Sequence, residues 1–169
     1  MIKKRIIGLV IGFSVLTAVN SCVYHDYSEI TTVGNTDQSL FAEVNEAGYV
    51  YYQNGDLLSP AGPSPHGSFK LRFNTIAQSS LDNTGELPAN GAFAAGAVIV
   101  KEIYENNVLA LYAVIKKSPG DASAADGHLW AEYALDGSTI VSITEKGTKC
   151  IDCHSGTPNR DLIRTFDLH

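Results

Sequence analysis

Two cysteines and a histidine near the C-terminal end have the spacing that most clearly indicates chemistry. They stand in the segment Cys150-Ile151-Asp152-Cys153-His154. Cysteines three positions apart lie about one helical turn from each other, so each thiol can form a thioether with one of the two vinyl groups of a porphyrin. The adjacent histidine then lies under the iron as its axial ligand. The pattern predicts one covalently attached haem c, held by Cys150 and Cys153, with His154 as the metal ligand.

Three other uses of a cysteine pair compete with this prediction. A local disulfide can form in an oxidising compartment. A thioredoxin-like redox pair needs a βαβ context, whereas this motif follows segments that are typical of antiparallel strands. A zinc site is usually built from two such pairs, and the sequence has one. Haem attachment is favoured because the N-terminal segment indicates export to the compartment where haem is attached.

The N-terminal segment has the features of a bacterial lipoprotein signal. Residues 1–21 begin with three positive charges, followed by an apolar stretch too short to span a bilayer comfortably. Cys22 follows directly, where a lipoprotein is cleaved and acylated. The alternative is an ordinary secretory signal that leaves Cys22 free. We predict a signal peptide over 1–21, lipidation of Cys22, and a periplasmic or cell-envelope protein anchored to the membrane.

The rest of the chain is acidic. Without the three cations of the signal peptide, nine Lys and Arg remain against 18 Asp and Glu, a net charge of −9. This balance argues against nucleic acid as a partner and suits a body held at a membrane by a lipid. Residues 22–38 are polar without apolar periodicity, which predicts a flexible tether. Residues 39–169 have the length of one domain.

The elements that must position the cysteine motif are mostly strands. Apolar, β-branched runs joined by short turns predict two antiparallel pairs, 97–104 with 108–115 and 129–135 with 138–144. Four consecutive strands form a meander. The predicted fold class is therefore mainly β (α+β): an antiparallel sheet with one or two packed helices and a C-terminal haem-attachment segment.

Two further elements are predicted upstream of the meander. The aromatic segment 48–58 contains Asn54-Gly55, which indicates a β-hairpin. A proline-rich connection follows over 59–67. After it, the apolar residues Phe69, Phe73, Ile76 and Ala77 have helical spacing, which predicts an amphipathic helix with Ser68 as its N-cap.

The ligand opposite His154 is restricted by composition. The single methionine is Met1, which is lost with the signal peptide, so Met/His ligation of the iron is excluded. Either a histidine or a lysine fills the distal position, or the iron is open to small molecules. His66 can ligate iron, although a turn position explains it as well. We assign no chemistry to His25, His128 or His169.

Two charged side chains fall on opposite faces of the strand 97–104. Alternation puts Lys101 on one face and Glu102 on the other, each among apolar neighbours. The charge that faces inward can belong to a functional site. Equally, Lys101 can extend outward from an edge strand. Arg72 borders the apolar face of the predicted helix.

Several short segments recur in the order of a known family. They are Lys70-Leu71-Arg72-Phe73-Asn74, residues 93–102, Val114-Ile115-Lys116, Trp130-Ala131-Glu132-Tyr133, the cysteine motif, and Asp161 with Thr165. In this order, from about His66 to Phe166, the chain resembles the cytochrome P-460 and cytochrome c′-β family. Its members are β-rich monohaem proteins that commonly dimerise and carry CxxCH near the C-terminus.

The resemblance implies roles for two side chains. Lys101 falls where the P-460 branch has the lysine that cross-links to the porphyrin edge, and Arg72 falls near the distal arginine that hydrogen-bonds a ligand. Both are therefore candidate catalytic residues, and Lys101 is also a candidate cofactor-binding residue.

The sequence departs from the hydroxylamine-oxidising members in one place. Where they carry a distal carboxylate, this chain has Leu111-Tyr112-Ala113, so removal of a proton from hydroxylamine lacks an obvious base. The c′-β branch instead caps its iron with phenylalanine and binds nitric oxide. The candidate caps are Phe69, Phe73 and Phe93.

Three functions remain open. The first is a P-460-like haem lipoprotein that binds or oxidises small nitrogen compounds such as hydroxylamine and nitric oxide, and whether it is an enzyme stays undecided. The second is an electron carrier with bis-His or His/Lys ligation. The third is a haem-bearing sensor or accessory subunit of a membrane complex. A redox partner and a homodimer are compatible with each.

Overall fold

The computed structural model describes residues 34–61 and 64–169. The predicted signal peptide, Cys22 and most of the predicted tether lie outside them. The described elements, in chain order, are α1 Asp37–Val44, β1 Val50–Tyr51, the 3₁₀ turn Tyr52–Gly55, β2 Ser68–Phe73, α2 Thr75–Gln78, β3 Val98–Glu105, β4 Val108–Lys117, β5 His128–Ala134, β6 Thr139–Val141, the 3₁₀ turn Ile143–Glu145, α3 Ile151–His154 and α4 Thr165–Leu168. None of the described helices is long and apolar enough to cross a membrane.

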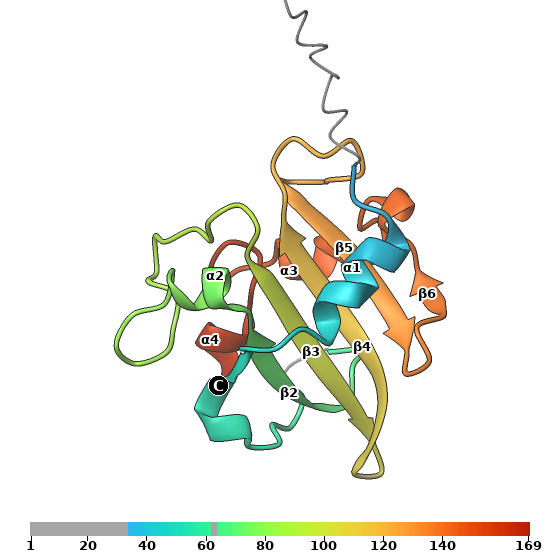
Figure 1. Cartoon of the computed structure of the whole chain (residues 1–169). Coiled ribbons are helices and arrows are strands. Elements are labelled where there is room, and N and C mark those ends of the chain that lie inside the picture. Colours follow the sequence, from blue (N-terminus) through green and yellow to red (C-terminus); the bar gives the residue numbers. More distant parts are fainter. Residues whose placement is uncertain (1–33, 62–63) are drawn as a thin grey trace, which may run out of the picture. The chain divides into compact units, whose positions relative to one another are not determined.

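The described strands form one antiparallel sheet. Its six strands lie side by side in the order in which they occur in the chain, from β1 to β6 (Figure 1). The predicted meander is confirmed as β3 to β6. Asn106 and Asn107, with φ of 51° and 63°, form the tight turn between β3 and β4, and Gly137, with φ of 87°, lies between β5 and β6. The mainly β, α+β fold class is therefore confirmed.

The helix predicted from Ser68 is wrong, because residues 68–73 form β2. This strand pairs with β3 along its whole length, from Ser68 opposite Tyr104 to Phe73 opposite Ile99. Phe69 and Phe73 are four positions apart, and that spacing puts them on one face of a strand as well as of a helix. A single helical turn, α2, follows, where the Asn74 side chain accepts the Ala77 N–H at 2.8 Å.

The hairpin predicted over 48–58 is also wrong. β1 pairs with β2, with Val50 opposite Phe73 and Tyr51 opposite Arg72. Asn54-Gly55 does turn the chain, but within a 3₁₀ turn in which Gln53 and Asn54 have φ of 45° and 57°. Of the predicted return strand, only Leu58 makes a bridge, to Phe69.

The folded body begins earlier than predicted. α1 starts at Asp37, and the Thr36 side chain accepts the Ser39 N–H at 3.1 Å. The Asn35 N–H donates to Asp121 at 3.0 Å. Residues 34–38, which the sequence assigned to the tether, therefore belong to the folded body.

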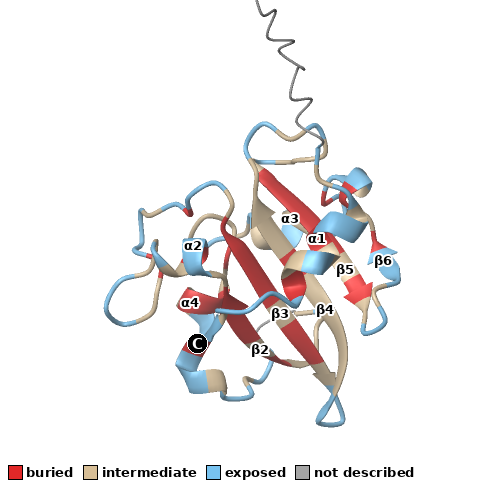
Figure 2. Ribbon diagram, in the orientation of Figure 1, coloured by how far each residue is buried: buried red, intermediate tan, exposed pale blue. Residues whose placement is uncertain are grey.

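The sheet is buried on both faces, and β2, β3 and β5 are mostly buried along their length (Figure 2). α1 packs on one face through Leu40 and Val44, which are fully buried. That face is formed mainly by Val98, Val100, Val114, Leu129, Ala131 and Tyr133. The other face carries a second cluster that includes Phe69, Leu71, Phe73, Ile99, Ile163 and Phe166. Residues of the C-terminal segment therefore cover the face opposite α1.

A buried ion pair joins α1 to the sheet. Arg72 Nε donates to Glu102 Oε1 at 2.8 Å, and Arg72 Nη1 donates to the Val44 carbonyl at 2.7 Å. The Tyr51 hydroxyl donates to the same carboxylate at 2.9 Å. Arg72 and Glu102 are 7% and 6% exposed, so the opposite charge of each compensates the cost of burying the other.

Removing the arginine should strongly destabilise the fold. In Arg72→Met, Glu102 keeps its tyrosine hydrogen bonds but loses its counter-charge in a buried position, and we expect a loss of about 3–5 kcal/mol in the free energy of unfolding. Urea denaturation measures it. The matched control is Lys70→Met on the same strand, expected to cost less than about 0.5 kcal/mol. A loss equal to that of the control would contradict the buried ion pair.

Candidate functional site

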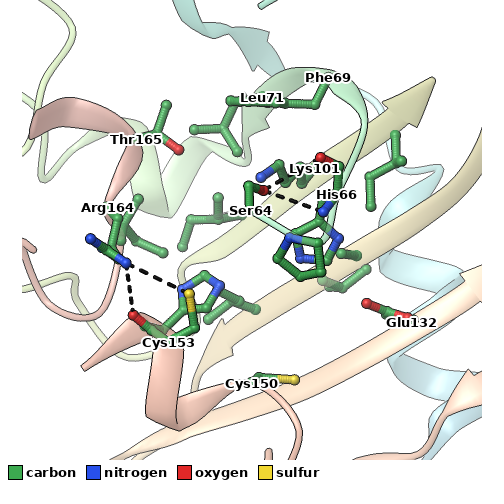
Figure 3. Close-up of a pocket in the computed structure, with 18 of the residues that line it drawn as sticks. Ser64, His66, Phe69, Leu71, Lys101, Glu132, Cys150, Cys153, Arg164 and Thr165 are labelled. Carbon is green, nitrogen blue, oxygen red and sulfur yellow. Dashed lines mark hydrogen bonds between the residues drawn. The ribbon is translucent and has the colours of Figure 1, made fainter. Parts of the chain in front are cut away.

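A cavity of about 410 Å³ lies on the sheet face opposite α1 (Figure 3). Strands β2 to β5 supply a mostly apolar wall, and the segments 64–67, 149–154 and 163–169 supply the rest. Its volume falls within the range of about 300–1,000 Å³ that is usual for ligand and cofactor pockets.

The cysteine motif lines this cavity. Cys150, Cys153 and His154 are all among the lining residues, and both thiols are free. The preceding turn depends on Gly147, which has a φ of +64° and where a Cβ would lie 2.6 Å from Trp130 Cδ1. The Gly147 carbonyl accepts the N–H of Cys150 at 2.8 Å and of Ile151 at 2.9 Å. A glycine is therefore needed to bring the motif against the tryptophan on β5.

His154 is held in one tautomer. Its Nδ1 lies 2.7 Å from the Leu162 carbonyl oxygen, and a carbonyl can only accept, so Nδ1 carries the proton. Nε2 is then a free acceptor, as a metal ligand requires. The Trp130 ring packs edge-on against the imidazole, with centroids 5.0 Å apart. Burial lowers the pKa of His154, although the Leu162 carbonyl opposes this, so the neutral ring is favoured.

A row of paired positions crosses the cavity wall. Leu71 on β2 pairs with Lys101 on β3, which pairs with Ala113 on β4, which pairs with Glu132 on β5. All four line the cavity. The small side chain of Ala113 therefore separates an amine from a carboxylate on the same wall.

Lys101 faces the cavity, so the alternative that it extends from an edge strand is wrong. β3 lies between β2 and β4, and the Lys101 ammonium lies 3.9 Å from the centroid of the Phe69 ring. Burial lowers the pKa of Lys101 to about 8, while the Cys153 thiol opposes this. A substantial part of this amine is therefore neutral at mildly alkaline pH.

Glu132 is a cavity residue to which sequence reasoning gave no role. Burial raises the pKa of its carboxyl, with Lys149 acting in the opposite direction. Figure 3 shows the carboxylate pointing into the cavity, on the same side as Cys150. The signal that could have identified it is strand alternation, which puts Glu132 on the same face as Trp130.

Two histidines also line the cavity. Burial, together with the charges of Lys101 and His154, lowers the pKa of His66 to about 4, so its ring is neutral at physiological pH. His169, to which the sequence gave no chemistry, is at the cavity too, and burial lowers its pKa. His128, to which the sequence also gave no chemistry, lies fully buried in β5.

Arg72, predicted to lie near a bound ligand, is not part of the cavity. It follows Leu71 on β2, so it faces α1, where it is bound to Glu102 and the Val44 carbonyl. Of the three predicted phenylalanine caps, Phe69 lines the cavity, whereas Phe73 and Phe93 are buried in the adjacent core.

A different arginine lines the cavity. Arg164 Nη1 donates to the Cys153 carbonyl at 3.1 Å, whereas Arg164 Nε is buried away from the cavity without a hydrogen-bond partner among the described residues. Figure 3 shows the guanidinium beside Cys153, where it can pair with a carboxylate of a cofactor such as a porphyrin propionate.

The other uses of the cysteine pair fit less well. Burial, together with the Glu132 and Glu145 carboxylates, raises the pKa of the Cys150 thiol. In redox-active CxxC pairs, by contrast, the pKa of the reactive thiol is lowered. Within the described residues, no group of three or more His, Cys, Asp or Glu side chains could hold a metal ion.

The chain matches no protein-family model, no curated protein and no solved structure.

The turn that carries Leu162 is fixed by the preceding carboxylate. Asp161 accepts the Phe93 N–H at 2.8 Å and the Lys117 ammonium at 2.7 Å, and His128 Nε2 lies 3.5 Å away. Burial alone raises the pKa of Asp161, but these neighbours together hold it well below its ordinary value of 3.8.

The depressed pKa predicts a dependence of stability on pH. The unfolded chain binds a proton near pH 4, where folded Asp161 stays ionised, so its contribution is present above about pH 4 and is lost as the pH falls below that value. Asp161→Asn should cost about 1–3 kcal/mol at pH 7, and the difference from wild type should shrink by about pH 3. Urea denaturation at both pH values measures it. Asp56→Asn, at an exposed carboxylate, is the control, and a pH-independent cost of Asp161→Asn would contradict the prediction.

Proposed function

We propose that the chain is an exported lipoprotein, anchored through Cys22, that carries one haem c and binds or oxidises small nitrogen compounds at the iron. One observation carries the proposal: the His154 Nδ1–H donates a hydrogen bond to the Leu162 carbonyl and leaves Nε2 as an acceptor, in the same cavity as two free thiols. A histidine that ligates iron needs this second hydrogen bond.

The chain's own residues have separate tasks in this proposal. Cys150 and Cys153 would hold the haem through two thioethers, each formed by addition of a thiol S–H across a vinyl group, and His154 Nε2 would bind its iron. Arg164, which lines the cavity beside Cys153, would pair with a carboxylate of the cofactor. When bound, the haem supplies an iron that can hold a small ligand and exchange electrons with it.

Lys101 and Glu132 lie in one row of paired positions on the sheet wall of the cavity, where the cofactor would bind. The Lys101 amine, whose pKa burial lowers to about 8, is placed for the bond to the porphyrin edge that the P-460 branch has. That C–N bond would replace a ring C–H and an amine N–H, and an external two-electron oxidant would take up the electrons. The Glu132 carboxylate can take a proton from hydroxylamine. It would thus replace the distal carboxylate of the hydroxylamine-oxidising proteins, which β4 lacks at Leu111-Tyr112-Ala113.

His66 favours a second candidate function. It lines the same cavity and is neutral at physiological pH, so its imidazole is able to ligate the iron opposite His154. With both axial positions occupied, the protein would be a bis-His electron carrier and would not bind small molecules at the iron.

Intact mass tests attachment of both groups. Protein matured in a host that assembles c-type cytochromes should weigh as much as the chain from Cys22 plus one haem and the acyl chains. Cys150→Ser together with Cys153→Ser should lose the haem mass alone, and Cys22→Ala should lose the lipid and release the protein from membranes. A colourless wild-type protein with the mass of polypeptide and lipid would contradict haem attachment.

The optical spectrum of the ferrous protein separates the two functions. For an open iron, we expect high-spin bands that become low-spin when nitric oxide is added, and no change in the starting spectrum for His66→Ala. A Soret band far to the red that returns to an ordinary position in Lys101→Met indicates the cross-link, with Lys70→Met as the control. Sharp low-spin bands without added ligand, lost in His66→Ala, would establish the electron carrier instead.

A further inference from the structure

We propose that Asp161 is a positioning residue for His154, acting through the Leu162 carbonyl and so setting the basicity of the axial imidazole. The effect on the iron rests on the proposed haem function, whereas the effect on the imidazole proton does not.

The backbone between Asp161 and Leu162 is in an unusual conformation. Their φ angles are 49° and 68°, in the left-handed region that side chains with a Cβ rarely adopt. Arg160 and Ile163 close this tight turn with two backbone hydrogen bonds of 2.9 Å, and leucine is an unfavourable residue for such a turn. The turn brings the Leu162 carbonyl to 2.7 Å from His154 Nδ1.

The carboxylate of Asp161 ties this turn to the sheet. Oδ2 accepts the Phe93 N–H, from the loop before β3, and Oδ1 accepts the Lys117 ammonium, at the end of β4. The fully buried His128 ring, at the start of β5, lies 3.5 Å from Oδ2. Three separate parts of the fold therefore converge on one side chain of the turn.

Asn159 holds the same turn from its other side. Its Oδ1 accepts the Leu162 N–H at 3.1 Å, and its Nδ2 donates to the carbonyls of Ser155 at 3.2 Å and Gly156 at 3.1 Å. Ser155 and Gly156 directly follow α3, so the Leu162 peptide is fixed both to the sheet and to the end of the cysteine motif.

The consequence for His154 follows from these two attachments. If the turn relaxes to ordinary backbone angles, the Leu162 carbonyl turns away and Nδ1 loses its acceptor. The imidazole then becomes a less basic ligand, and its tautomer is no longer fixed. A weaker iron–nitrogen bond and a higher reduction potential are expected, because a less basic ligand stabilises ferric iron less.

The test uses the full haem-loaded chain. Asp161→Asn should shift the iron–histidine stretching band of the ferrous protein to lower frequency and raise the midpoint potential. The matched control is Asp121→Asn, whose carboxylate likewise accepts backbone N–H groups, from Asn35 and Ser123, but does not line the cavity. It should lower stability without moving either signal. If Asp161→Asn also lowers stability and leaves both signals unchanged, the residue is structural only and the proposal is overturned.

A second variant and a second readout keep the proposal testable if Asp161→Asn folds poorly or no haem is attached. Asn159→Ala, at a partly exposed position, should change the band and the potential in the same direction. If the purified protein contains no haem, the haem proposal fails. Long-range ¹⁵N–¹H spectra then still report the His154 tautomer, with the proton on Nδ1 in wild type and partly on Nε2 in both variants. Unchanged tautomers would overturn the role of Asp161.

Discussion

Burial of the central sheet on both faces is the constraint on which the site depends. Successive side chains of β3 point to opposite faces, so Lys101 and Glu102 each enter an apolar interior. Glu102 is compensated by Arg72 and a tyrosine hydroxyl under α1. None of the ion pairs in the described part of the chain includes Lys101. On the cavity face Lys101 therefore has no ion-pair partner among the described residues, although Glu132 lies two strands away on the same wall, and desolvation there lowers the pKa of the amine.

The C-terminal segment completes the site without extensive regular structure. α3 and α4 have four residues each, too short to be stable alone, and their positions are set by contacts. Gly147 permits the close approach to Trp130, and Asp161 fixes the turn that receives the His154 proton. The sheet therefore acts as a rigid wall, and a few side-chain hydrogen bonds position the reactive groups against it.

The parts that could be predicted from the sequence are those decided by local rules. The meander followed from β-branched runs and tight turns, and the cysteine motif from its spacing alone. β2 was mistaken for a helix because Phe69 and Phe73 satisfy both periods. The ligand role of Arg72 was implied by the family resemblance, whereas strand alternation puts Arg72 on the face that packs against α1. Glu132 and His128 were missed because their surroundings depend on the pairing of strands and on the C-terminal segment, which no local pattern encodes.

Desolvation at the cavity also lowers the pKa of the nitrogen-bearing side chains that line it. Burial lowers the pKa of His66 to about 4 and that of Lys101 to about 8, so His66 presents a nitrogen lone pair at physiological pH and part of Lys101 does so at mildly alkaline pH. For the proposed haem protein, these pKa values therefore do not distinguish an iron open to small molecules from an iron bound by His66 or Lys101. The two residues differ in how they are held, because Lys101 lies on a central strand, whereas His66 precedes β2 in an irregular segment. In that proposal, the conformation of the segment around His66 decides whether the second ligand position of the iron is open for chemistry or closed for electron transfer.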